Sequence, residues 1–145
     1  MYRIANIKLM VVRESAIPSE TRKITTSRDL YALLREYFSG HDREEMVVVM
    51  LNMKHAVTAL HTVAIGSLSQ SVVHPRETFK AAITMNAAAI ILAHNHPSGD
   101  PSPSDDDRLL TTRLKQVGEL IGLPVLDHLV IGTDRYVSFA DKGWL

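Results

Sequence analysis

The sequence predicts a single mixed α/β domain in which helices flank one mixed β-sheet. Segments rich in β-branched residues alternate with segments whose apolar residues have helical spacing, in the order β-α-β-β-α-β-α-β-β. The chain has 145 residues, of which 46% are hydrophobic and 22% are charged, as in an ordinary globular protein. This length predicts one domain, residues 1–145.

The first three expected elements are a strand, a helix and a strand. Residues 2–13 alternate in part between apolar and polar side chains, which favours a strand. Residues 27–40 have helical spacing of apolar residues, with Ser27 as the expected N-cap and Gly40 as the stop. Residues 44–52 contain a β-branched run that is typical of a buried strand.

The middle of the chain predicts a third strand, a loop, a helix and a fourth strand. The strand over residues 56–66 is followed by a loop over residues 67–74. A helix over residues 75–86 begins with a proline, which suits a first helical position. Residues 87–94 are apolar up to His94, and their place between two helical segments favours a strand.

The last part of the chain predicts a long helix and two strands. Residues 104–122 have helical spacing and end at Gly122, a residue typical of helix C-termini. Residues 124–132 and 135–140 have strand composition, and a hairpin can join them through residues 132–134.

The overall composition excludes several classes of protein. There are no cysteines, so disulfides and thiolate metal sites are excluded. The net charge is zero, with 16 basic and 16 acidic residues, so nucleic-acid binding is not supported by charge. No apolar run reaches the length of a membrane span, and the N-terminus does not resemble a signal peptide. We therefore expect a cytoplasmic protein, and the sequence does not indicate its oligomeric state.

The stretch LAHNHPSGDPSPSDDD, residues 92–107, has the composition of an acidic, turn-rich loop, but a loop does not explain its two histidines. His94 and His96 follow the expected strand, where alternate residues point to one side about 6.6–6.8 Å apart at Cα. Asp107, in the first turn of the next helix, adds a carboxylate. Two imidazoles and one carboxylate leave a fourth position open, which is the arrangement of catalytic zinc.

The same stretch also has an explanation without a metal. Asp105, Asp106 and Asp107 all complement the partial positive charge of a helix N-terminus, and Ser104 with Asp107 resembles a capping box. Asp100 lies in a Pro- and Gly-rich turn. The residues themselves leave both explanations open.

The complete string, His94-x-His96-Pro97, six residues, Ser104, two residues, Asp107, resembles the motif of the JAMM (MPN+/JAB) metalloprotease family. The flanking segments resemble its RadC branch over roughly residues 25–145. The resemblance implies the JAB/MPN, cytidine-deaminase-like architecture. It also implies Zn²⁺ held by His94, His96 and Asp107, with Ser104 supporting the oxyanion. Residues 1–24 would be a strand-like extension of a stand-alone domain without the N-terminal helical region of RadC-like proteins.

The family also uses a glutamate as general base, at the start of a strand before the motif. Glu44 matches that position by resemblance. Its neighbour Glu45 is the alternative, because strand alternation turns the two side chains to opposite faces. A third candidate, Glu77, lies in a helical first turn, where a glutamate usually complements the helix dipole.

Asp127 and His128 recur in the RadC pattern and have two interpretations. They can orient a ligand imidazole by a hydrogen bond, or they can pair strands structurally. His74 is expected in a loop or as an N-cap before the proline that follows it.

Taken with the resemblance, the string implies a zinc-dependent hydrolase that cleaves a peptide or isopeptide substrate by zinc-activated water. The alternative from another class is a non-enzymatic or DNA-acting RadC-like module associated with DNA repair or mobile elements. A zinc hydrolase acting on another bond is the third possibility, although the lack of cysteines excludes the zinc deaminase signature.

Overall fold

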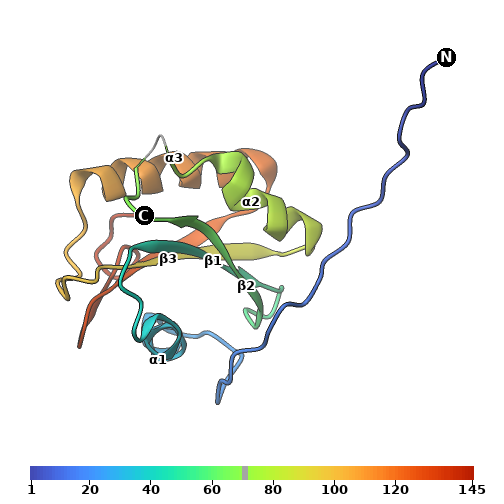
Figure 1. The fold of residues 1–145 in the computed structure, drawn as a ribbon. Helices are drawn as coiled ribbons and strands as arrows, with labels where there is room; N and C mark the ends of the chain where they lie inside the picture. The colour runs from blue at the N-terminus through green and yellow to red at the C-terminus, as the bar shows by residue number, and fades with distance from the viewer. Residues whose placement is uncertain (70–71) are drawn as a thin grey trace.

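The computed structural model describes residues 1–69 and 72–145, and within them it forms one five-stranded sheet with helices on both faces (Figure 1). This confirms the mixed α/β class with a single mixed sheet. The predicted loop over residues 67–74 lies partly outside the described residues. The elements are α1 (Ser27–Phe38), β1 (Glu45–Leu51), β2 (Val57–Ile65), α2 (Pro75–Thr84), β3 (Ala89–Asn95), α3 (Asp105–Ile121), β4 (Val125–Ile131) and β5 (Tyr136–Ser138).

The strands lie in the order β2-β1-β3-β4-β5, so β3 is at the centre of the sheet. It pairs antiparallel with β1 and parallel with β4, and α3 makes the crossover between the two parallel strands. Because β3 ends where α3 approaches the sheet, side chains at the end of this strand can meet side chains from the first turns of the helix. The predicted hairpin is present, since β4 pairs antiparallel with β5.

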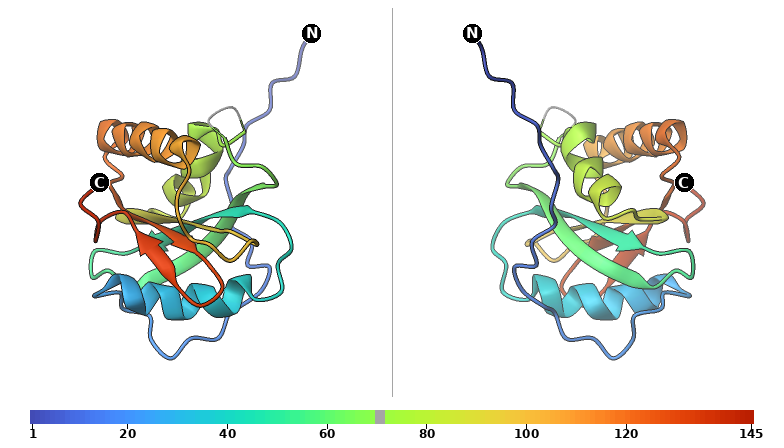
Figure 2. Two further views of the ribbon diagram at one scale, coloured as in Figure 1. Left: turned by 90° about the vertical axis from the view of Figure 1, so that its left-hand side faces the viewer. Right: turned by 90° about the vertical axis from the view of Figure 1, so that its right-hand side faces the viewer.

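Alternate residues of the strands form two separate cores, one on each face of the sheet. Helices α2 and α3 cover one face and α1 covers the other (Figures 1 and 2). Ile90 and Leu92 of β3 pack in the core beneath α2 and α3, whereas Ile91 and Ala93 pack on the α1 side. The same alternation turns the next residue of this series, His94, toward α3.

The helix ends match the predictions in part. The N-cap of α1 is Thr26, so the prediction of Ser27 was wrong by one residue. The Thr26 side chain accepts from the Asp29 N–H, and the Asp29 carboxylate accepts from the Thr26 N–H, which completes a capping box. Helix α3 begins after Ser104 and ends at Gly122, whose left-handed backbone favours glycine, both as predicted.

The predicted strand over residues 2–13 is wrong. These residues form no strand and run outward from the folded part as an extended segment (Figure 1). Their apolar side chains are exposed, with Tyr2 at 97% and Ile4 at 94%. The chain first meets the sheet at Lys23, through one bridge to Ala56. A strand requires a neighbour for its backbone groups, and residues 2–13 have strand composition without such a neighbour.

None of the helices in the described part of the chain has the length and apolar character that a membrane span requires.

Candidate metal centre

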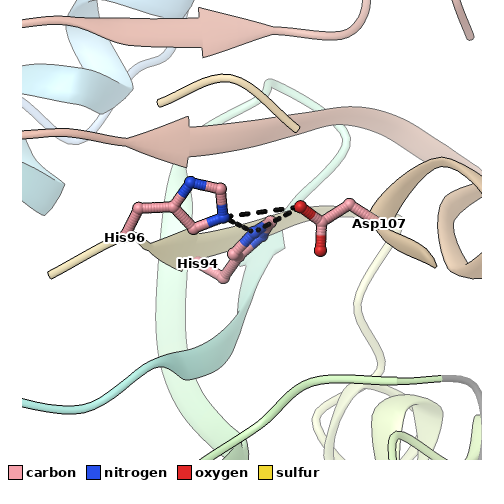
Figure 3. A group of neighbouring side chains, drawn as sticks. All are labelled: His94, His96 and Asp107. Atoms are coloured by element: carbon pink, nitrogen blue, oxygen red, sulfur yellow. Dashed lines mark hydrogen bonds and ion pairs between the residues drawn. The ribbon is translucent and has the colours of Figure 1, made fainter. Parts of the chain in front are cut away.

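The side chains of His94, His96 and Asp107 converge at the end of β3 (Figure 3). His94 belongs to β3, His96 follows the strand directly, and Asp107 lies in the first turn of α3. Each offers one ligand atom, and these atoms lie within 4.8 Å of one another. The parallel crossover therefore joins a His-x-His pair to a carboxylate eleven residues later, and the group can hold a metal ion.

The distances within this cluster are short and nearly equal. The two Nε2 atoms of His94 and His96 are 3.1 Å apart. Oδ2 of Asp107 lies 3.3 Å from Nε2 of His94 and 3.4 Å from Nε2 of His96. The three atoms thus form a nearly equilateral triangle.

Neighbouring polar groups keep the Asp107 carboxylate ionised in spite of its burial. Burial raises the pKa of Asp107, but interactions with the His94 and His96 imidazoles and the hydrogen bond from the Ser104 N–H outweigh it and hold that pKa well below its ordinary value. His94 is fully buried and Asp107 is 4% exposed. A buried carboxylate beside two imidazoles attracts a cation, whether that cation is a proton or a metal.

His96 holds a proton more readily than an ordinary histidine does. The hydrogen bond with Asp107 raises the pKa of His96 above its ordinary value, against the opposing effect of burial. Its other ring nitrogen, Nδ1, lies 2.7 Å from the carbonyl oxygen of Asp100. A carbonyl oxygen can only accept, so Nδ1–H donates there and Nε2 faces the cluster.

A tight turn places the carbonyl oxygen of Asp100 next to Nδ1 of His96. Gly99 has a φ of +94°, a conformation that favours glycine, and its N–H donates to the His96 carbonyl oxygen. A Cβ at this position would lie 2.5 Å from the Thr133 hydroxyl. The turn that looked like a plain Pro- and Gly-rich loop in the sequence therefore orients a candidate ligand.

Ser104 and Asp107 form the capping box that the sequence suggested. The Asp107 N–H donates to the Ser104 hydroxyl oxygen at 3.0 Å, and the Ser104 N–H donates to Oδ2 of Asp107 at 2.8 Å. The explanation as a helix cap and the explanation as a metal site thus both apply to Oδ2 of Asp107. Ser104 is exposed, and its hydroxyl proton is not used by this cap.

The two glutamates at the start of β1 point to different partners. Oε1 of Glu44 lies 3.7 Å from Nε2 of His96, and its side chain is 35% exposed. Glu45 instead pairs with Nδ1 of His41 at 2.9 Å. Alternation along the strand therefore separates them as expected, and the structure brings Glu44 to the candidate centre.

Comparison with known proteins places this geometry in a family. The model of the RadC-like JAB domain matches residues 24–144. The chain belongs to the RadC-like JAB domain family. This confirms the resemblance seen in the sequence, and the fold agrees with a JAB domain.

Several curated relatives of this RadC-like JAB domain carry the name UPF0758 protein. One from Desulforamulus reducens is 49% identical over 132 residues, which cover 90% of this chain and 58% of that protein. One from Caldanaerobacter subterraneus is 48% identical over 125 residues, covering 86% and 54%. One from Methanosarcina acetivorans is 42% identical over 132 residues, covering 91% and 58%. The chain thus spans little more than half the length of these relatives.

Both interpretations of Asp127 and His128 in this JAB domain have a structural counterpart. Nε2 of His128 lies 2.7 Å from Nδ1 of His94, on the side away from the cluster. Burial lowers the pKa of His128 well below its ordinary value, which favours the neutral ring. The Asp127 carboxylate accepts from the Ser138 hydroxyl and the Ala140 N–H, so it joins β4 to the end of β5.

Other residues considered in the sequence lie outside the centre. Glu77 forms an exposed pair with Lys80, three residues later on α2. His74 is the N-cap residue of α2, and its side chain makes no capping bond.

Two polar residues near the centre were not identified from the sequence. Thr111 contacts His128, and Asn95 accepts from the Glu45 N–H while it donates to the Arg43 carbonyl. Thr111 follows Asp107 by one helical turn, which is the sequence signal that could have identified it.

Proposed function

We propose that this JAB domain holds Zn²⁺ through His94, His96 and Asp107 and hydrolyses amide bonds in a peptide or isopeptide substrate. The observation that carries the proposal is the triangle of ligand atoms, with sides of 3.1, 3.3 and 3.4 Å. Two atoms bound at about 2.0–2.1 Å to a tetrahedral zinc ion are about 3.3–3.4 Å apart. The donor set therefore fits one face of a zinc tetrahedron.

The chemistry of the donors supports the same ion. Two imidazole nitrogens and a carboxylate oxygen are ordinary zinc ligands, and three protein ligands are typical of a catalytic rather than a structural site. The Asp107 carboxylate is ionised, and Nδ1 of each histidine is engaged outside the cluster. Bound zinc supplies Lewis acidity and lowers the pKa of water, which makes a nucleophile available at neutral pH.

The residues around the cluster supply the remaining functions of a hydrolase. The partly exposed Glu44 carboxylate, 3.7 Å from Nε2 of His96, can take a proton from the attacking water and return it to the leaving amine. The Ser104 hydroxyl accepts from the Asp107 N–H, so its own proton is free to donate to an oxygen that gains negative charge. Glu44 and Ser104 are thus the proposed catalytic residues.

A cleavage screen tests the proposal. Zinc-loaded protein is incubated with unmodified peptides, peptides with free C-terminal tails and isopeptide-linked peptides, and new amines are quantified. We expect cleavage of at least one class, loss of cleavage after chelation, and recovery when zinc is added back. Zinc-loaded protein that cleaves none of them and instead binds DNA with a steep salt dependence would favour the DNA-acting alternative.

A further inference from the structure

Buried polar contacts connect His94 to the backbone of α3. Nδ1 of His94 lies 2.7 Å from Nε2 of His128, and Nδ1 of His128 lies 2.6 Å from the Thr111 hydroxyl oxygen. The Thr111 hydroxyl lies 2.6 Å from the carbonyl oxygen of Asp107. Both histidines are fully buried and Thr111 is 2% exposed, so each group depends on the next for a partner.

The direction of each hydrogen bond follows from its last member. The Asp107 carbonyl oxygen can only accept, so the single proton of the Thr111 hydroxyl points toward it. The hydroxyl oxygen therefore accepts from His128, whose proton must be on Nδ1. In the neutral ring Nε2 of His128 then has a lone pair, which accepts from Nδ1–H of His94. The lone pair of His94 that remains is on Nε2, and Nε2 faces His96 and Asp107.

We propose that Thr111 and His128 are positioning residues that fix the tautomer of His94, so that its Nε2 lone pair is presented to the metal centre. The inference rests on the proposed function insofar as the cation is a metal ion. The tautomer itself is a property of the metal-free protein. Neither Thr111 nor His128 has contact with the ligand atoms of the cluster, and both act through Nδ1 of His94.

The packing around this chain of hydrogen bonds holds it in one arrangement. The His128 ring stacks on Phe139, with centroids 4.8 Å apart and an angle of 20° between the planes. Asp107 and Thr111 lie one turn apart on the same face of α3, and both are buried. Helix α3 thus contributes the carboxylate of the cluster and, through Thr111 and His128, also fixes which ring nitrogen of His94 carries the proton. In His96 the carbonyl oxygen of Asp100 has the corresponding role, because it accepts from Nδ1–H and leaves Nε2 facing the cluster.

Three threonine variants separate positioning from structure. Thr111→Val removes the hydroxyl at nearly constant shape, and Thr111→Ser restores it. Thr112→Val is the matched control, because the exposed Thr112 hydroxyl makes the same bond to a carbonyl one turn back, that of Arg108, without contact to His128. The readouts are the ¹⁵N chemical shifts of the His94 and His128 rings in the metal-free 145-residue chain, and the zinc affinity by chelator competition.

In the wild type, Thr111→Ser and Thr112→Val, we expect a protonated Nδ1 on both His94 and His128. In Thr111→Val the His128 proton moves to Nε2 and donates to His94, which leaves Nδ1 of His94 unprotonated. Zinc affinity should then fall about 10–100-fold, as is usual when a partner of a ligand histidine is lost.

Two results would overturn the inference. One is a His94 ring without a proton on Nδ1 in the folded wild type, which needs no variant to fold. The other is a folded Thr111→Val protein with unchanged His94 shifts and unchanged zinc affinity. If the tautomer changes as expected but the wild type binds no zinc, the positioning inference stands and the proposed function fails.

Discussion

One oxygen of Asp107 caps helix α3 and also faces the histidines. Oδ2 accepts from the Ser104 N–H at 2.8 Å and lies 3.3 Å from Nε2 of His94. The helix cap therefore fixes the carboxylate in the position that a ligand requires. The chain contains a second capping box, Thr26 with Asp29 on α1, whose carboxylate is not part of the cluster. The pair of boxes allows capping and metal binding to be measured separately.

Replacing Asp107 should separate its two functions. In Asp107→Asn the amide oxygen can still accept from the Ser104 N–H, so much of the cap is retained, but the negative charge is lost. We expect zinc affinity to fall at least about tenfold, measured by chelator competition. Asp29→Asn removes the charge of the other capping box and should leave zinc affinity unchanged. Equal zinc affinity in Asp107→Asn and the wild type would argue against Asp107 as a ligand.

The adjacent glutamates of β1 provide a matched pair for the general base. Glu44→Gln should lower amide hydrolysis by about 10²–10⁴-fold, because the amide cannot take up the proton of water. Its zinc content should stay at the wild-type level. Glu45→Gln alters the contact with His41, away from the cluster, and should keep most of the activity. The assignment fails if turnover depends on Glu45 and not on Glu44, measured on whichever substrate the screen identifies.

Ser104 should contribute to turnover through its hydroxyl proton and to stability through its oxygen. Ser104→Asp retains an N-cap acceptor but cannot donate, so the melting temperature should change little while turnover falls about 10²–10³-fold. Ser104→Ala removes both functions and should also cost about 1 kcal/mol of folding free energy. Thermal unfolding and initial rates of the two variants distinguish the effects. Full activity in Ser104→Asp would exclude hydrogen-bond donation by this residue.

The pH dependence of stability should have opposite signs with and without zinc. The pKa of His96 is raised in the folded state, so a protonated His96 stabilises the metal-free protein fully below pH about 6.5. This stabilisation is lost as the pH rises through the raised pKa of His96. Zinc needs the same nitrogen without its proton, so zinc affinity should rise by up to about tenfold per pH unit in that window and then level off.

Calorimetry in chelator and in zinc, from about pH 6 to about pH 8.5, measures both dependences. His96→Gln is the control, because it removes the titrating ring and should flatten the difference between the two curves. Identical slopes with and without zinc would show that zinc and the proton do not share this site.

The sequence predicts best those elements whose pattern of apolar side chains shows which of their faces are buried. The β-branched run of β1 requires a core on both faces of the strand, and the apolar spacing of α3 requires a core on one face of the helix. The structure has a core on each face of the sheet. Residues 2–13 have strand composition as well, yet strand formation also depends on a partner strand that local sequence does not reveal. Thr26 and Ser27 are both good caps, and only the path of the backbone decides between them.

In the candidate site, the sequence predicted residues whose spacing carries chemistry. His94, His96 and Asp107 are brought together because a parallel crossover returns α3 to the end of β3. The spacing of Thr111, one helical turn after Asp107, places it on the same face of the helix but does not reveal what its hydroxyl contacts. Its importance depends on the register of β4 against β3, which sets His128 opposite Leu92 and beneath the helix. Contacts between distant segments of this kind depend on tertiary packing that no local pattern contains.

The metal centre is tested most directly by the metal content and metal affinity of the 145-residue chain. We expect about one tightly bound zinc ion per chain by elemental analysis, with two nitrogen ligands and one carboxylate by X-ray absorption. His94→Ala and Asp107→Ala should lose this ion while they keep the wild-type circular dichroism spectrum. Wild-type protein that is purified without zinc and binds none on titration would show that His94, His96 and Asp107 do not form a zinc site.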